Sequence, residues 1–350
     1  MQGRYPGCSG RPDGKPGRQQ CVNPPIGTAA RPAARSRRWE ESRPDDSSRN
    51  AVGTYGRSPR GHPERRPKMN GASSCPAGRL MRDARLTVVT AAYQPDMAFL
   101  SAAAVSIMLA VSEPVIWRIQ LDQATLHAAD TLADQVRAWI GAAPVHVHVA
   151  SHTARSGPGA ARMYAAAATT TRWLTVLDAD DLLPVAALDR QLALLDAHPD
   201  ARWAVGSGHT LHADGERIHW PHDLPETVPA GLIARYTRDT GHMPTMPISG
   251  IWNTAALLAL GGWPATPVDE DTSVKLALTS VFPGVATPDS VYVYRRDVPG
   301  QVTVQPRDPR LTGEGRAQAV ARLRGLADIG LAPADLLAGD WTVFLSGHSA

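Results

Sequence analysis

Residues 81–350 contain no cysteine, because the three cysteines of this 350-residue chain, Cys8, Cys21 and Cys75, all precede them. A disulfide framework needs paired cysteines, and a thiolate zinc site needs several of them. Both are therefore excluded for this stretch. Its composition fits a reducing compartment, and we expect the protein in the cytoplasm.

Long hydrophobic runs are also missing. The most apolar stretch, 97–111, is too short to span a bilayer and is interrupted by Ser101 and Ser106. The amino terminus is polar and lacks the apolar segment of a secretory signal peptide. We expect a soluble protein without a transmembrane segment, with peripheral contact to a membrane left open.

Residues 1–83 have few of the aliphatic residues that build a core. The first 80 residues hold 11 prolines and 11 glycines without a period, a composition typical of disorder. Their net charge is +10, whereas residues 81–350 carry −7. A basic arm for nucleic acid or an anionic membrane is one interpretation. We favour a solvated tail, or translation from Met69 or Met81, and expect no nucleic-acid partner, because no pattern organises the arginines.

From residue 84 onward, strand-like and helix-like segments alternate. Strands are predicted at 86–90, 115–121, 145–149 and 173–177, with helices at 97–111, 127–140, 160–170 and 184–196. This alternation predicts an α/β fold with a mainly parallel central sheet and helices on both faces. Farther on we predict a hairpin at 202–220, helices at 254–260, 272–282 and 314–328, and a last strand at 290–296. The chain then divides into a main domain at 84–304 and a C-terminal helix and tail at 305–350.

Acidic residues stand at the ends of two predicted strands, where α/β sheets bind ligands. These are Asp122 and the run Asp178-Ala179-Asp180-Asp181. Three carboxylates in four residues repel one another unless a cation intervenes, and Mg²⁺ or Mn²⁺ takes one or two carboxylates plus substrate phosphates. In an extended segment, Asp178 and Asp180 would face the same side. A solvated loop that caps the next helix is the alternative, but the strand leading into the run favours the metal site.

The order of these features resembles family 2 glycosyltransferases. The resemblance covers residues 84–304 and rests on the strand 86–90, Asp122, Gly157-Pro158-Gly159-Ala160-Ala161-Arg162, the acidic run, Gly261-Gly262-Trp263, Glu270-Asp271 and Tyr294-Arg295. It implies a GT-A fold, which is Rossmann-like, with a smaller acceptor-binding part. It also implies a nucleotide diphosphate sugar donor, a carbohydrate or other hydroxyl acceptor, and transfer with inversion assisted by Mn²⁺ or Mg²⁺.

The resemblance also assigns roles around the donor. Asp122 would bind the nucleotide base, Arg162 would lie near the donor, and Asp178 would contact the ribose or the sugar. Asp180 would coordinate the metal beside Asp178, with Asp181 as the alternative. Arg295 would bind the diphosphate.

For the acceptor, the resemblance makes Asp271 the catalytic base, held beside Glu270 in a loop just ahead of the helix 272–282. Asp269 is the main competing candidate. An ion pair or a helix cap is the alternative role for these acids. The base would take the proton of the acceptor hydroxyl as its oxygen attacks the anomeric carbon.

The sequence departs from the family in two places. Gln123-Ala124-Thr125 follows Asp122 where a second acid, Gly and Ser are frequent, so the nucleotide base is not assigned. Arg296-Asp297-Val298 stands where many members have a histidine, which leaves Asp297 or the neighbouring arginines as substitutes.

Three other functions compete with the transferase. A sugar-nucleotide pyrophosphorylase would have a Gly-rich basic loop after its first strand, where this chain has 91–95. A haloacid-dehalogenase-type phosphatase would have its nucleophilic acid on the first strand rather than the fourth. An inactive carbohydrate-binding relative would not need the acids. Trp220, Trp252 and Trp263 are candidates for an acceptor site, with core packing the favoured role of each.

Overall fold

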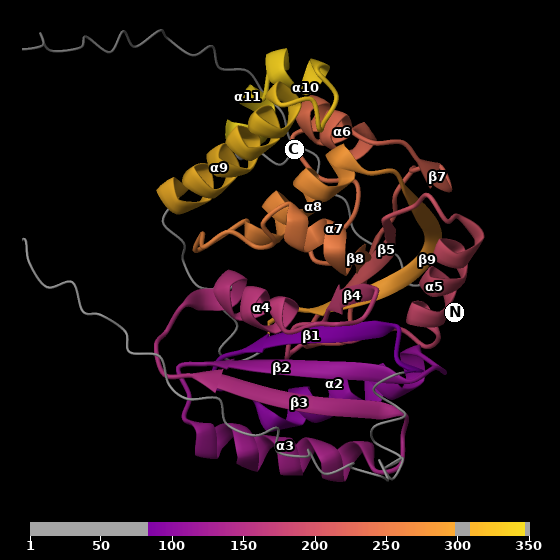
Figure 1. Cartoon of the computed structure of the whole chain (residues 1–350), viewed down its shortest axis with the longest axis vertical. Helices are drawn as coiled ribbons and strands as arrows, with labels where there is room; N and C mark the ends of the chain where they lie inside the picture. The colour runs from indigo at the N-terminus through magenta and orange to yellow at the C-terminus, as the bar shows by residue number, and fades with distance from the viewer. Residues whose placement is uncertain (1–82, 298–308, 347–350) are drawn as a thin grey trace, which may run out of the picture. The chain divides into compact units, whose positions relative to one another are not determined.

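The computed structural model describes residues 83–297 and 309–346 (Figure 1), and these belong to one compact unit. The basic tail expected at 1–83 lies outside the described residues except for its last position. Within the described ranges, no helix combines the length and the hydropathy needed to cross a bilayer.

Four parallel strands form one half of the sheet. They are β1 (Leu86–Ala92), β2 (Val115–Asp122), β3 (Val145–His152) and β4 (Trp173–Val176), in the order β3-β2-β1-β4. The connecting helices are α2 (Met97–Ala110), α3 (Leu126–Ile140) and α4 (Gly157–Ala167). Because parallel strands need such crossovers, the alternation in the sequence produces this half directly.

The two faces of β1 belong to two different cores. Val88 packs in a cluster with side chains of α2 and α3, whereas Val89 packs in a second cluster with α4. Successive side chains of a strand point to opposite faces. Both residues are fully buried, so helices cover this part of the sheet on both sides, as Figure 1 shows.

The other half of the sheet is mixed. After α5 (Ala187–Ala197) come β5 (Trp203–Leu211), β6 (Arg217–Trp220), β7 (Thr227–Val228), α6 (Leu232–Thr240), β8 (Ile251–Asn253), α7 (Thr254–Ala259), α8 (Glu270–Val281) and β9 (Gly284–Arg295). The nine-stranded order is β3-β2-β1-β4-β8-β5-β9-β7, with β6 paired to β5. Here β8 is antiparallel to both β4 and β5, whereas β9 is parallel to β5.

The predicted fold class is confirmed: an α/β fold with a mainly parallel central sheet. Several expected boundaries were wrong, among them the starts of α4, α5 and α9 (Pro309–Asp328), and two of the errors concern the candidate site. The last strand begins at Gly284 rather than at 290, and α8 begins at Glu270 rather than at 272. Glu270 and Asp271 therefore lie in the first turn of α8 and not in a loop ahead of it.

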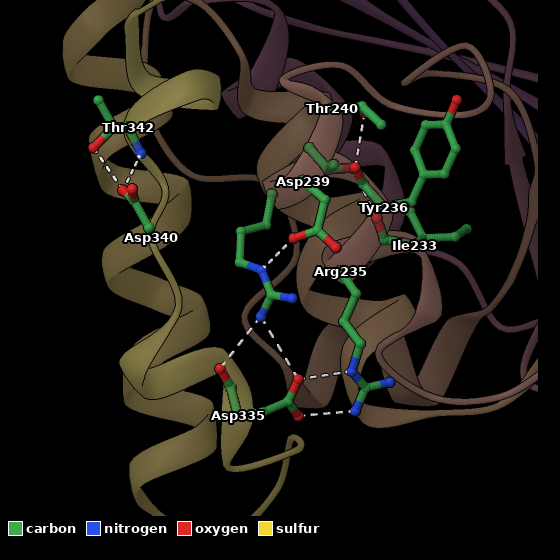
Figure 2. Close-up of polar contacts among 10 residues, drawn as sticks. Ile233, Arg235, Tyr236, Asp239, Thr240, Asp335, Asp340 and Thr342 are labelled. Atoms are coloured by element: carbon green, nitrogen blue, oxygen red, sulfur yellow. Dashed lines mark hydrogen bonds and ion pairs between the residues drawn. The ribbon is translucent and has the colours of Figure 1, made fainter.

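Residues 309–346, which the sequence places in a C-terminal helix and tail, form α9 (Pro309–Asp328), α10 (Asp335–Ala338) and α11 (Thr342–Ser346). Leu336, Trp341 and Phe344 are buried in the same cluster as residues of α6 and α8. Figure 2 shows the polar side of this contact, where Arg235 of α6 donates to both oxygens of Asp335, at 2.7 and 2.9 Å. We therefore propose that the folded domain continues to residue 346.

Two adjacent leucines of α10 test this packing. Leu336 is 0% exposed, whereas Leu337 is 36% exposed. Leu336→Ala should lower the free energy of unfolding by about 2–5 kcal/mol, the usual cost of a buried leucine. Leu337→Ala is the matched control and should cost less than about 1 kcal/mol. Equal losses in urea denaturation would show that α10 is not part of the core.

Candidate active site

The acidic run forms a turn at the carboxyl end of β4. The N–H of Asp181 donates to the carbonyl of Asp178 at 3.1 Å, so the run is not extended as the sequence argument assumed. Asp178 and Asp180 are partly exposed, while Asp181 is 0% exposed. Burial and the charge of Asp178 raise the pKa of Asp180 to about 6. Two neighbouring carboxylates thus share a site that opens to solvent.

Asp181 has a different environment. Its carboxylate accepts one hydrogen bond from the Tyr292 hydroxyl and one from the backbone N–H of Arg295, each at 2.8 Å. The Tyr292 oxygen in turn accepts from the N–H of Asp178, at 3.2 Å. Burial, and then the charges of Asp178 and Asp180, raise the pKa of Asp181 well above its usual value. This carboxylate therefore fastens the turn to β9 from the interior.

Arg295 fastens the turn from the other side. Its Nε donates to the carbonyl of Asp180, and another guanidinium nitrogen donates to the carbonyl of Phe99 at 3.2 Å. The guanidinium also lies 4.5 Å from the centre of the Phe99 ring. The side chain thus joins the acidic turn to α2.

Arg162 is a buried cation between two acids. It is 4% exposed and donates to Asp178 at 2.7 Å and to Glu270 at 2.6 Å. Burial alone lowers the pKa of a guanidinium, but the charges of Asp178 and Glu270 reverse this effect and raise it. Arg162 therefore connects the acidic turn after β4 with the first turn of α8.

A glycine permits this close approach. A Cβ on Gly159 of α4 would lie 2.6 Å from the carbonyl oxygen of Pro264 and 3.1 Å from Cγ of Glu270. Any side chain here would push α4 away from the start of α8. The glycine in the Gly157–Arg162 segment thus has a packing role beside the arginine.

Asp122 organises the start of α4. Its carboxylate accepts from the backbone N–H groups of Ser156 and Gly157, both at 2.9 Å, and bonds to Nε2 of His152 at 2.7 Å. Burial would raise the pKa of Asp122, but these hydrogen bonds outweigh it and hold the pKa below its usual value. An ionised carboxylate at a helix amino terminus is electrostatically favourable.

The acids at the start of α8 face two directions. Glu270 is 7% exposed and faces Arg162, and burial together with the charge of Asp271 raises its pKa to about 7. Asp271 is half-buried and borders a small cavity with Pro247, Ile248 and other apolar residues. Asp269 precedes the helix with a positive φ of 58°. Of these acids, Asp271 is the one that lines the cavity.

The structure brings most of the predicted site residues together. Arg162 contacts both Asp178 and Glu270, and Arg295 contacts the backbone of the acidic turn. Asp122 instead bonds to the start of α4. Sequence reasoning missed Tyr292 and His152, the partners of Asp181 and Asp122. The only signal for Tyr292 was its place in the predicted strand two residues before Tyr294, on the same face.

The three tryptophans that are candidates for an acceptor site differ in how much of each side chain is exposed to solvent. Trp252 and Trp263 are 2% and 5% exposed and belong to the core, as favoured from the sequence. Trp220 on β6 is 46% exposed, and its Nε1 donates to Thr210 at 2.8 Å. Only Trp220 of these three presents much of its ring to solvent.

A family comparison agrees with this geometry. Residues 125–251, which span the acidic turn and Arg162, match the family described as Glycosyl transferase family 2. This part of the chain is similar to the family 2 glycosyltransferases. Its predicted resemblance to that family is confirmed, and glycosyl transfer is its reaction class. No curated protein compared with the chain matches it.

Solved structures show the same fold. S. aureus TarS, residues 1–349, in complex with UDP-GlcNAc has a TM-score of 0.58 at 15% identity, over 75% of this chain and 73% of that one. A second crystal structure of the same TarS segment gives a TM-score of 0.55 at 15% identity, over 75% of this chain and 72% of that one. A mannosyltransferase, PcManGT from Pyrobaculum calidifontis in complex with GDP-Man and Mn²⁺, gives 0.49 at 15% identity, over 77% and 75%. The TarS likeness establishes a GT-A fold for this glycosyltransferase.

The buried cation can be tested by its removal. Arg162→Met keeps an unbranched apolar stem but removes the guanidinium, which leaves Asp178 and Glu270 without their shared partner. Breaking a buried ion pair in this way should cost about 3–5 kcal/mol in the free energy of unfolding. Arg155→Met, at an exposed position just before α4, is the control and should cost less than about 1 kcal/mol. Similar urea midpoints for the two variants would contradict the bridging role.

Proposed function

We propose that this glycosyltransferase moves a sugar from a nucleotide diphosphate donor to an acceptor hydroxyl by metal-assisted direct displacement, with inversion. One observation carries the proposal. Arg162 connects the acidic turn, a site suited to a metal and a diphosphate, with the start of α8, where the candidate base lies. Arg162 thus connects the proposed donor side of the reaction with the proposed acceptor side.

The metal would be Mn²⁺ or Mg²⁺, held by Asp180 and Asp178. No cluster of three or more His, Cys, Asp or Glu side chains in the described ranges is arranged to hold an ion. The two partly exposed carboxylates still fit, because such cations take one or two carboxylates and complete their shell with substrate phosphates and water. When bound, the ion would stabilise charge on the departing diphosphate. Asp181 is not proposed as a ligand, since both its oxygens bond inside the protein.

On the acceptor side, Asp271 would act as the general base. It would accept the hydroxyl proton while the hydroxyl oxygen forms a bond to the anomeric carbon and the bond from that carbon to the diphosphate breaks. A single attack of this kind inverts the sugar carbon. Asp271 lies in the first turn of α8 and borders the cavity, where an acceptor hydroxyl could approach it.

The remaining predicted site residues would act by positioning. Arg162 would hold Asp178 and Glu270, and Arg295 would hold the backbone of Asp180. Asp122 would shape the loop before α4, where the nucleotide base is expected to bind. A soluble protein in the cytoplasm and a carbohydrate acceptor stay predictions from the sequence.

A donor screen tests the function directly. Purified protein would be incubated with UDP- and GDP-sugars, beginning with UDP-GlcNAc because the TarS relative in fold was solved with it. Release of the nucleoside diphosphate that depends on Mn²⁺ or Mg²⁺ is the expected result. Metal-independent release, or production of a sugar 1-phosphate, would contradict the proposal.

The metal assignment rests on Asp180. Asp180→Ala should weaken metal-dependent donor binding by about 100-fold or more, since even outer partners of a metal site contribute about 10–100-fold. Calorimetry with and without a chelator measures this loss. Asp200→Ala, at an exposed turn, is the control and should bind the donor normally. Donor affinity that is equal in Asp180→Ala and wild type would remove the metal from this site.

The base assignment rests on Asp271. Asp271→Asn keeps size and hydrogen bonding but removes basicity, so kcat should fall by about 10²-fold or more. The donor dissociation constant should not change, because the base acts on the acceptor. Asp269→Asn is the matched control and should retain kcat. The reverse pattern would make Asp269 the base, and no effect from either would exclude direct displacement assisted by these acids.

A further inference from the structure

The buried lysine on α8 has no role in the reaction as described so far. The chain has 36 lysine and arginine residues, but lysine occurs only at positions 15, 68 and 275. Lys275 is thus the only lysine beyond residue 68, and it is 0% exposed. Burial of an ammonium group is costly unless it is paired, so the position calls for an explanation.

The contacts of Lys275 connect α8 to one segment of chain. Its Nζ donates to Oγ1 of Thr245 at 2.9 Å and to the carbonyl of Met246, and it lies 5.6 Å from the centre of the Trp252 ring. Thr245 and Met246 belong to the segment 242–249, which joins α6 to β8. Among the described residues, no carboxylate lies within ion-pairing distance of this Nζ. The lysine therefore acts as a tie between α8 and this segment.

The need of the Met246 carbonyl for a hydrogen-bond donor does not explain why Lys275 is buried. The Met246 carbonyl also accepts from the N–H of Ser249 at 3.2 Å and from its hydroxyl at 2.9 Å. The carbonyl would thus keep two partners without Lys275. The ammonium group is buried for a reason other than the demand of this acceptor.

The position of Lys275 suggests that reason. It follows Asp271 by four residues on α8, and residues four apart lie on one helix face. The segment that Lys275 holds also supplies Pro247 and Ile248, which line the cavity beside Asp271. Burial lowers the pKa of Lys275 to about 7, and the charge of Asp271 acts in the opposite direction.

We propose that Lys275 is a positioning residue for Asp271: it ties the segment 242–249 to α8 and so fixes the wall against which the base lies. This inference rests on the proposed function. Arginine would not serve, because its five fixed donors need more acceptors than Thr245 and Met246 supply.

Lys275→Met gives the main test. Methionine fills a similar volume without charge, and replacement of a buried charge by an apolar side chain is often neutral or stabilising. We expect kcat to fall by about 10-fold or more, as misplacement near a reacting group does. We expect an unchanged donor dissociation constant and an unchanged or higher urea midpoint. Hydrogen exchange of 242–249 should rise while that of β1 stays the same.

Two further variants complete the experiment. Ser280→Ala is the matched control, because Ser280 is also buried on α8 and its hydroxyl has no hydrogen-bond partner among the residues that the structure describes. It should keep both kcat and exchange. Lys275→Gln keeps a donor without a charge, and both its kcat and its exchange should lie between those of wild type and Lys275→Met. If Lys275→Met does not fold, Lys275→Gln serves as the test in its place.

The possible failures can be told apart. Normal kcat in Lys275→Met, or a parallel loss of kcat and stability in both lysine variants, would overturn the positioning role. Unchanged hydrogen exchange of 242–249 would show that Lys275 does not hold this segment to α8. If wild type transfers no sugar from any donor, the proposed function fails, whereas the exchange measurement still decides whether Lys275 holds the segment.

Discussion

The candidate site depends on one buried cation. Arg162 is surrounded by protein, and its two ion pairs connect elements that are 16 and 108 residues away along the chain. An unpaired buried charge would cost several kcal/mol, so the acids and the arginine hold one another in place. The close packing at Gly159 exists because α4 must bring this guanidinium to both carboxylates. The acidic turn after β4 and the first turn of α8 are therefore held next to each other by their shared pairing with Arg162.

Sequence patterns predicted the parallel half of the sheet because its rules are local. Each strand there is a short buried run, each crossover is a helix, and parallel order places Asp122 and Asp178 at the same edge. The mixed half follows different rules. The strand β8 has three residues, too few for a periodicity, and it is a strand only because β4 and β5 lie on either side. Such an element is determined by its neighbours in space.

The acidic run shows the same limit at the level of single residues. Asp178, Asp180 and Asp181 are chemically alike and almost adjacent, yet burial separates their roles. Asp181 points inward because Tyr292 and the backbone of Arg295, more than 100 residues later, supply donors to it. No property of the run itself distinguishes the inward acid from the outward ones. The sequence could therefore predict a candidate site here, but not which carboxylate oxygens are free to bind a ligand.

The candidate base lies in the first turn of α8 and not in a loop, and the contacts of that helix bear on its position. Glu270, Asp271 and Lys275 occupy its first two turns, and each faces a different neighbour: α4, the cavity and the segment 242–249. A loop could present an acid, but it would let the three groups move independently. A helix fixes the backbone positions of the three residues relative to one another, since its hydrogen bonds hold each backbone in helical geometry. A change that shifts α8 at any of the three contacts would therefore also shift the backbone of Asp271.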